Sequence, residues 1–240
     1  MAASSDNVVY RRVRRPDATL VARAAQIAVS DLYEALPASE RDALLMKPAI
    51  RPLVQGQRIA GPAVTARCPA RDNLMTHKAL RLALRGDVLV VASGEPSGAQ
   101  WGYLAAVYAE RQGLAGVVVD GCIRDADELR RRSYPVWSSA ISPAHPDKRG
   151  AGTVNAPIEC GGVEIYPGDV VCADGDGVLV IRRQTLSDIV ERAEKRTAHE
   201  SEAVAAMAAG KSLFDLHDLG DAFARSGVVE IDGYWDGEAN

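Results

Sequence analysis

The chain has no apolar run that approaches the ~20 residues needed to cross a bilayer as a helix. Its longest hydrophobic stretches are short and strand-like. The first residues, Met1 to Asp6, are small and polar and lack the hydrophobic core of a secretory signal. We therefore expect a cytoplasmic protein with no membrane partner.

The sequence also lacks an excess of positive charge. Its 28 Lys and Arg residues stand against 32 Asp and Glu residues, which gives a formal net charge of -4. A protein whose main surface binds nucleic acid carries the opposite balance. We therefore expect no nucleic-acid partner.

Cysteines are few and far apart. None of the four, Cys68, Cys122, Cys160 and Cys172, has a neighbour at the close spacing of a zinc site. Each lies in an apolar, strand-like segment, so the pattern predicts buried, reduced thiols. Cys122 lies close to Arg124 in the sequence, but nothing nearby supplies a base for a nucleophilic thiol.

What the chain does contain is enough apolar sequence for a sizeable core. With 240 residues and 47% hydrophobic content, it fits one large α/β domain with an extended tail. Periodicity and capping residues predict helices over 17–36, 74–84, 99–112, 126–131 and 185–209. Alternation and turn residues predict strands over 58–67, 88–92, 117–119, 134–138, 156–165, 170–173 and 178–181, the last three as an antiparallel meander.

The most informative stretch follows the predicted strand over 117–119. That strand stops at the turn dipeptide Asp120-Gly121, and Arg124 and Asp125 come just before the next helix. Strand-to-helix turns are where α/β sheets place ligands. A guanidinium can grip a carboxylate with two hydrogen bonds, and a carboxylate beside it can hold Mg²⁺. The pair indicates a site for a small oxo-acid and a metal; the alternative is a surface ion pair that caps a helix.

Further motifs occur together in the order of one family. They are Asp72-Asn73 with His77, Gly86-Asp87-Val88, Gly113 to Asp125, Pro135-Val136-Trp137, Asn155-Ala156-Pro157-Ile158, Cys160-Gly161-Gly162, Pro167-Gly168-Asp169-Val170, and Asp174 with Asp176-Gly177-Val178. From Val13 to Ile231 the chain resembles the RraA-like family. That family includes class II pyruvate aldolases acting on 4-hydroxy-4-methyl-2-oxoglutarate and 4-carboxy-4-hydroxy-2-oxoadipate.

The resemblance implies an architecture. It implies a swivelling β/β/α sandwich as a single domain over residues 1–210. An arm at 211–240 would pack on this domain or on a neighbouring subunit. It also implies a homotrimer or homohexamer with active sites between subunits.

The resemblance also implies a site. Arg124 would bind the pyruvate-type carboxylate and stabilise the enolate, and Asp125 would ligate Mg²⁺ or Mn²⁺. Glu200 of the adjoining subunit would complete the site. Backbone groups of one loop would line the substrate pocket: Gly98, Ala99, Gln100, Trp101, Gly102 and Leu104.

One departure from the family pattern bears on catalysis. The aldolases carry Asp or Glu where this chain has Tyr103, and that acid supports the metal through its waters. A tyrosine is neutral at pH 7 and cannot replace the charge, but it can donate or accept a hydrogen bond. We therefore count Tyr103 as a candidate catalytic residue and expect weakened metal affinity.

Three functional classes follow. The favoured one is a divalent-metal lyase that releases pyruvate from a small 2-oxo acid, by retro-aldol cleavage or by decarboxylation of oxaloacetate. The second is another enzyme on the same scaffold, with Tyr103 in proton transfer. The third is a binding protein resembling the branch of the family that regulates an RNase, in which the Arg-Asp pair is not intact. His77 is predicted to orient a loop near the pocket rather than to exchange protons. His145 is predicted to lie in a solvated loop over 142–152, and the alternative is that this loop covers a neighbouring site.

Overall fold

The centre of the fold is a run of parallel strands. The computed structural model describes residues 7–93 and 97–235, without the side chains of 199–201. Four parallel strands lie side by side in it, in the order β3 (Ile59–Arg67), β4 (Val88–Ala92), β6 (Gly116–Ile123) and β7 (Val136–Ile141). All three pairings are parallel. The strands are rich in Val and buried on both faces, as parallel sheets require.

Shorter strands extend this centre. Beyond β3 lie β8 (Thr153–Val154) and β1 (Val8–Val9), and beyond β7 lies β2 (Arg51–Pro52). Strand β11 (Val170–Ala173) runs antiparallel to both β3 and β12 (Val178–Ile181). The pair β9 (Ile158–Cys160) and β10 (Val163–Ile165) forms a separate antiparallel hairpin.

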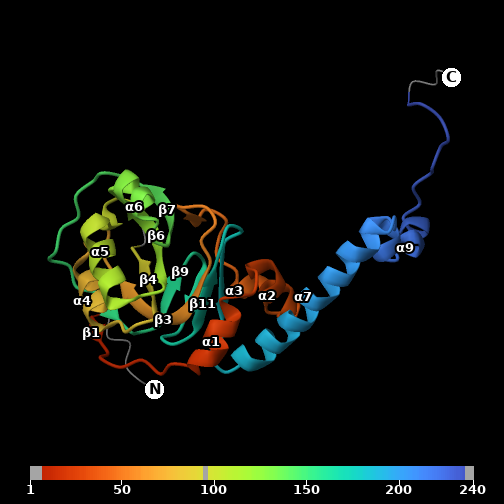
Figure 1. The fold of residues 1–240 in the computed structure, drawn as a ribbon. Coiled ribbons are helices and arrows are strands. Elements are labelled where there is room, and N and C mark those ends of the chain that lie inside the picture. The colour runs from red at the N-terminus through yellow and green to blue at the C-terminus, as the bar shows by residue number, and fades with distance from the viewer. Residues whose placement is uncertain (1–6, 94–96, 236–240) are drawn as a thin grey trace. The chain divides into compact units, whose positions relative to one another are not determined.

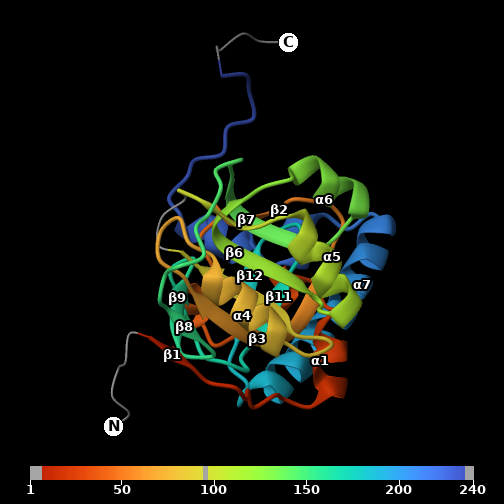
Figure 2. The same ribbon diagram turned by 90° about the vertical axis from the view of Figure 1, so that its left-hand side faces the viewer.

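Helices cover one face of the parallel strands. They are α4 (Leu74–Leu82), α5 (Tyr103–Gln112) and α6 (Ala126–Arg132), which connect successive strands and lie in front of the sheet in Figure 2. Their inward residues Ala79, Ala106 and Leu129 share one apolar core with Leu89 and Val91 of β4.

The opposite face packs on β9 to β12. Val88 and Val90 of β4 alternate with Leu89 and Val91 and point into a second core with Val171 and Val180. A third core joins the far side of β11 and β12 to α1 (Ala18–Ala24), α2 (Val29–Ala35), the short α3 (Arg41–Leu44) and the start of α7 (Leu186–Ala208). This layering, visible in Figure 1, confirms the α/β class and the β/β/α sandwich.

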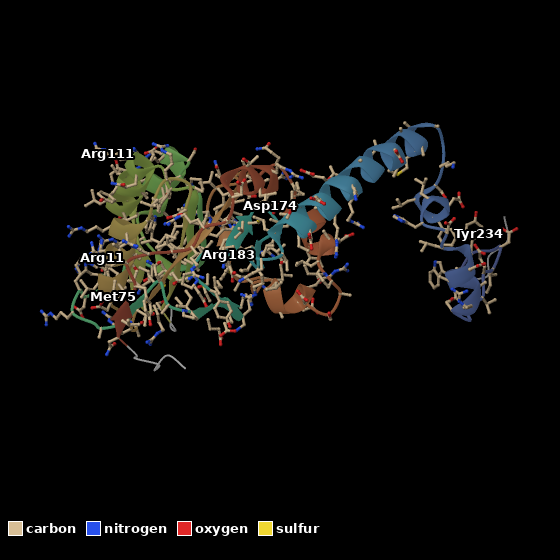
Figure 3. All side chains as sticks on the ribbon, turned by 90° about the horizontal axis from the view of Figure 1, so that it is seen from below. Arg11, Met75, Arg111, Asp174, Arg183 and Tyr234 are labelled. Carbon is tan, nitrogen blue, oxygen red and sulfur yellow. The ribbon has the colours of Figure 1, made fainter. Side chains whose placement is uncertain are left out.

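The predicted helix over 17–36 is in fact two helices. Asp17 caps α1 as predicted, by accepting from the backbone N–H groups of Thr19 and Leu20. The helix then breaks, because the Asp174 carboxylate accepts from the backbone N–H of Val29 at 2.9 Å and starts α2 there. Asp174, labelled in Figure 3, comes from the loop between β11 and β12. A local pattern could not show this distant cap.

The predicted helix over 99–112 begins later than expected. Residues Ala99–Trp101 form strand β5, which pairs with the end of β6, and α5 starts at Tyr103. Strand pairing supplies hydrogen bonds that override the helical preference of these residues. The segment that forms the candidate site is therefore extended.

Two other predictions change in detail. Strand β6 does not stop at Asp120-Gly121 but continues to Ile123, with a shift in its register against β7 between Val119 and Cys122. The predicted strand over 156–165 is folded back on itself at Gly161 and Gly162, whose φ angles are 60° and 81°. The predicted meander is confirmed for β11 and β12, which pair antiparallel, but the other neighbour of β11 is β3 rather than β10.

The chain divides into two compact units, Met1–Glu194 and Lys195–Asn240, and α7 runs through the boundary. The second unit contains α8 (Leu213–Leu216) and α9 (Gly220–Arg225), where the rings of Phe214 and Phe223 meet edge to face at 6.1 Å. The boundary at residue 210 between domain and arm stays a prediction. Within the described residues, no helix is both long and apolar enough to cross a membrane.

Candidate active site

Arg124 and Asp125 stand where β6 ends and α6 begins. The backbone N–H of Arg124 donates to the carbonyl of Trp101 at 3.0 Å, which extends the pairing of β5 with β6. Asp125 is the N-cap residue of α6 and has a left-handed backbone with φ 56°, and its carbonyl accepts from Leu129 at 3.0 Å. The turn thus directs two adjacent charged side chains out of the carboxyl edge of the sheet.

The two side chains contact each other and the backbone of the next turn. Arg124 Nε lies 3.6 Å from Asp125 Oδ2, and the same oxygen accepts from the backbone N–H of Tyr103 at 3.0 Å. Gly102 passes so close that an added Cβ would lie 2.7 Å from Asp125 Oδ2 and 3.1 Å from Arg124 Cγ. Position 102 therefore needs glycine for a close approach to the charged pair.

A loop over residues 142–152 lies on the other side of the pair. The backbone N–H of Ala99 in β5 donates to the carbonyl of Ala144 at 3.1 Å. The next residue, His145, places Nδ1 3.2 Å from a terminal nitrogen of Arg124. Three segments far apart in sequence therefore meet at the guanidinium.

These segments enclose a cavity of about 140 Å³. Its volume suits a ligand of a few heavy atoms. Larger open hollows, of about 680 and 370 Å³, lie elsewhere and do not include the Arg-Asp pair. The small cavity is lined by Asn73, His77, Ala99, Gln100, Trp101, Gly102, Leu104, Ala105, Arg124, Asp125, Pro146 and Lys148.

Most of the described residues predicted from sequence line this cavity, but Gly98 and Tyr103 do not, and the prediction for Glu200 stays untested. Gly98 lies beside it and packs on Arg71, whose Cα would be 2.8 Å from an added Cβ. The ring of Tyr103 lies 5.9 Å from the Arg132 guanidinium of α6, while Gly102, Leu104 and Ala105 supply the cavity wall at this turn. The side chain of Glu200 lies outside the described residues.

Lys148 and Asn73 were not predicted as site residues. Lys148 comes from the loop over 142–152 and adds a second cation to Arg124 against the single carboxylate of Asp125. The cavity therefore has a net positive charge, which suits an anionic ligand. The motif Asp72-Asn73 with His77 was the available signal for Asn73, whereas an exposed lysine in a loop gives none.

Two buried polar side chains in the cavity wall each have an atom that is free to form a hydrogen bond with a ligand. Gln100 is 1% exposed and Asn73 is 7% exposed. Neither Gln100 Nε2 nor Asn73 Oδ1 has a hydrogen-bond partner among the described residues. Buried polar atoms without partners are costly, so a ligand that bonds to them would recover that cost.

His77 is neutral in the folded protein at pH 7. Burial lowers the pKa of its imidazole below the ordinary value, and the charge of Lys148 lowers it further. The cysteines lie in the core as predicted. Cys122 is buried, which raises the pKa of its thiol and leaves it unsuited to act as a nucleophile.

Comparison with known proteins identifies the family. A family model, RraA-like (Aldolase/RraA), matches residues 29–180. The chain belongs to the RraA-like family. The match covers the Arg-Asp pair, the cavity and the β9 to β12 layer, so the family assignment applies to the site as well as to the fold.

Two relatives of this RraA-like protein carry the same name. A protein of Halalkalibacterium halodurans, named "Putative 4-hydroxy-4-methyl-2-oxoglutarate aldolase", is 38% identical over 63% of this chain and 72% of its own length. A Burkholderia mallei protein of the same name is 42% identical over 57% of this chain and 82% of its own length.

Solved structures agree on the fold. Streptomyces coelicolor RraAS2, described as an unusual member of the RNase ES inhibitor RraA protein family, superposes with a TM-score of 0.71 at 28% identity, over 80% of this chain and 98% of its own. An uncharacterized protein of Pseudomonas syringae gives 0.73 at 24% identity, over 84% and 98% of the two chains.

Proposed function

We propose that this protein is a carbon–carbon lyase that cleaves or decarboxylates a small 2-oxo acid through a pyruvate enolate. The observation that carries the proposal is the meeting of Arg124, Asp125 and the extended Gly102 backbone at one small, positively charged cavity. The names of the Halalkalibacterium and Burkholderia relatives support an aldolase-type reaction.

The cavity can stabilise the charge that such a reaction creates. When the bond between C3 and C4 of a 2-oxo acid breaks, its electron pair stays on C3 and delocalises onto the carbonyl oxygen as an enolate. Arg124 would hold the carboxylate and this developing oxyanion with its parallel N–H donors. Protonation of C3 then gives pyruvate. Loss of CO₂ from oxaloacetate leaves the same enolate, so one site would serve both reactions.

Retro-aldol cleavage also needs a group that accepts the proton of the 4-hydroxyl. The Asp125 carboxylate and the neutral His77 imidazole both line the cavity. Either can accept a proton at pH 7. A proton-transfer role for Tyr103 belongs to the second class of function predicted from sequence. The Tyr103 ring contacts the Arg132 guanidinium rather than the cavity, and this role stays a prediction.

The cavity offers few side-chain ligands for a divalent cation. Within the described residues, no group of three or more His, Cys, Asp and Glu side chains could enclose a metal. Mg²⁺ often binds through one or two carboxylates and keeps several waters. Asp125 would hold it, with Asn73 Oδ1, which has no partner in the described part of the chain, as a neutral oxygen on the same cavity wall. When bound, Mg²⁺ or Mn²⁺ supplies Lewis-acid stabilisation of the enolate oxygen.

A coupled assay with lactate dehydrogenase tests the proposal. Purified protein is given oxaloacetate and 4-hydroxy-2-oxo acids, with and without Mg²⁺ or Mn²⁺, and a reaction without protein corrects for decarboxylation by metal alone. We expect metal-dependent pyruvate release. Arg124→Lys keeps the positive charge but loses the two parallel N–H donors of the guanidinium, so turnover should fall by ~10²-fold.

Arg130→Lys is the matched control for this change. Arg130 lies further along α6, is exposed, and among the described residues its guanidinium pairs with Asp127. Its turnover should stay at the wild-type level. If no substrate yields pyruvate with either metal, the lyase proposal is wrong. A role as an RNase inhibitor, the function named for the family of the Streptomyces relative, would then be favoured.

A further inference from the structure

We propose that His145 is a positioning residue for Arg124, and that the loop over residues 142–152 is a strap that holds His145 in place. This rests on the proposed function, in which Arg124 grips the substrate carboxylate. It adds a residue that neither the family motifs nor the sequence pattern singled out for catalysis.

The direction of the hydrogen bond fixes the state of the imidazole. His145 Nδ1 lies 3.2 Å from a terminal nitrogen of Arg124. A guanidinium donates hydrogen bonds and cannot accept them, so Nδ1 accepts with its lone pair and the ring proton is on Nε2. The acceptor is uncharged. It therefore orients the guanidinium without neutralising the charge that attracts an anionic ligand.

Arg124 needs such an orienting contact. Its side chain is 36% exposed, and its nearest charged neighbour, Asp125 Oδ2, lies 3.6 Å from Nε. That oxygen is also occupied by the N–H of Tyr103. Contacts on Nε from one side and on a terminal nitrogen from the other fix the plane of the guanidinium. A planar guanidinium forms two parallel hydrogen bonds to a carboxylate only when the two groups lie in about the same plane.

His145 is exposed, so its position depends on the backbone around it. On one side, the Ala144 carbonyl accepts from Ala99 N–H at 3.1 Å. On the other, Asp147 N–H donates to Arg71 O at 2.6 Å, and Asp147 O accepts from Asn73 N–H at 3.0 Å. Short anchors one residue before and two residues after His145 leave its Cα little freedom.

Asp72 ties down the far end of the strap. Its side chain is buried, and Oδ2 accepts from the backbone N–H groups of Arg149 at 2.6 Å and Gly150 at 2.7 Å. Oδ1 accepts from Leu74 N–H at the start of α4. One carboxylate therefore joins the strap to the helix whose Asn73 and His77 line the cavity.

Oxalate binding tests the proposal, because oxalate is a stable planar mimic of the pyruvate enolate. Titration calorimetry with Mg²⁺ present would compare wild type with His145→Phe, which keeps the ring and removes the acceptor. We expect the Kd to rise by about five- to tenfold, the effect of losing one hydrogen bond to a charged group at a partly exposed site. His217→Phe changes an exposed histidine of the second unit and should leave the Kd unchanged.

Two further variants separate positioning from general structure. His145→Gln restores a neutral acceptor, so its Kd should return to within about twofold of wild type. Asp72→Asn has one oxygen where two carboxylate oxygens accept three N–H groups, so it should weaken oxalate binding. Its effect should shrink when His145→Phe is already present. Thermal unfolding of each variant checks that the fold is retained.

The outcomes distinguish this proposal from the function on which it rests. If Arg124→Ala abolishes oxalate binding while His145→Phe binds as wild type does, the positioning role is wrong and the lyase proposal stands. If His145→Gln is as weak as His145→Phe, the acceptor is not what matters, and the proposal also fails. If Arg124→Ala binds oxalate normally, the proposed function itself is wrong.

Discussion

Gly102→Ala is the change that tests the geometry of the site most directly. The φ angle of Gly102 is -166°, a conformation that any residue adopts, so the backbone carries no penalty. The new methyl carbon would lie 2.7 Å from Asp125 Oδ2, where ordinary contact begins at 3.4 Å. The carboxylate must therefore move by about 0.7 Å, with Arg124 Cγ pressed at 3.1 Å on the same side.

A shift of that size falls on the two groups proposed to meet the substrate. Misplacement of reacting groups by about 1 Å costs on the order of 10²-fold in rate. We expect kcat/KM for pyruvate release to fall by ~10²-fold and oxalate binding to weaken, while the midpoint of thermal unfolding changes little. Gly175→Ala is the control, because nothing lies within 4 Å of its added Cβ. Turnover of Gly102→Ala within threefold of wild type would show that the charged pair is not positioned against this backbone.

Three further outcomes are expected. Tyr103→Phe should keep turnover within twofold if the ring serves only to pack on Arg132, and a larger loss in the pyruvate assay would give its hydroxyl a part in the reaction. Burial raises the pKa of Asp72, but its backbone N–H bonds and the charge of a nearby lysine outweigh this and lower it below the usual value. The carboxylate therefore stabilises the fold above the unfolded pKa of ~3.9, and this is lost as pH falls through the folded pKa. Urea unfolding should show Asp72→Asn to be about 1–2 kcal/mol less stable at pH 7, with a difference that shrinks below about pH 4. Arg15→Met leaves the fully buried Asp87 carboxylate without its ion-pair partner, and the free energy of unfolding should drop by about 3–5 kcal/mol; a loss under 1 kcal/mol in urea unfolding would contradict this.

Sequence patterns predicted the elements whose signal lies in their own residues. Strands Val88–Ala92, Val170–Ala173 and Val178–Ile181 lie where their apolar runs placed them. The helix after Asp125 and the cap at Asp17 also follow from local chemistry. In each case the signal, an apolar run or a capping residue, lies within or next to the element, even where the strand pairs with a distant strand.

The incorrect predictions arise where the structure depends on contacts between residues far apart in the sequence. The break before Val29 depends on Asp174, which lies 145 residues away. The strand Ala99–Trp101 exists because β6 offers it a free edge, and its residues alone favour a helix. The same limit applies to the site. Lys148 lines the cavity and His145 contacts Arg124 because Asp72 and Ala99 hold their loop there, and no spacing in the sequence indicates this.

The left-handed backbone of Asp125 has a consequence for how such sites diverge. At φ 56°, most side chains cost roughly 1–2 kcal/mol, while Asp, Asn and Gly are accommodated readily. Of these, Asp brings the negative charge. Replacement by Asn would therefore remove that charge in one evolutionary step and leave the turn, the helix and the fold undisturbed. A scaffold built in this way can lose its chemistry without losing its stability, so non-catalytic descendants would be folded proteins available for other roles.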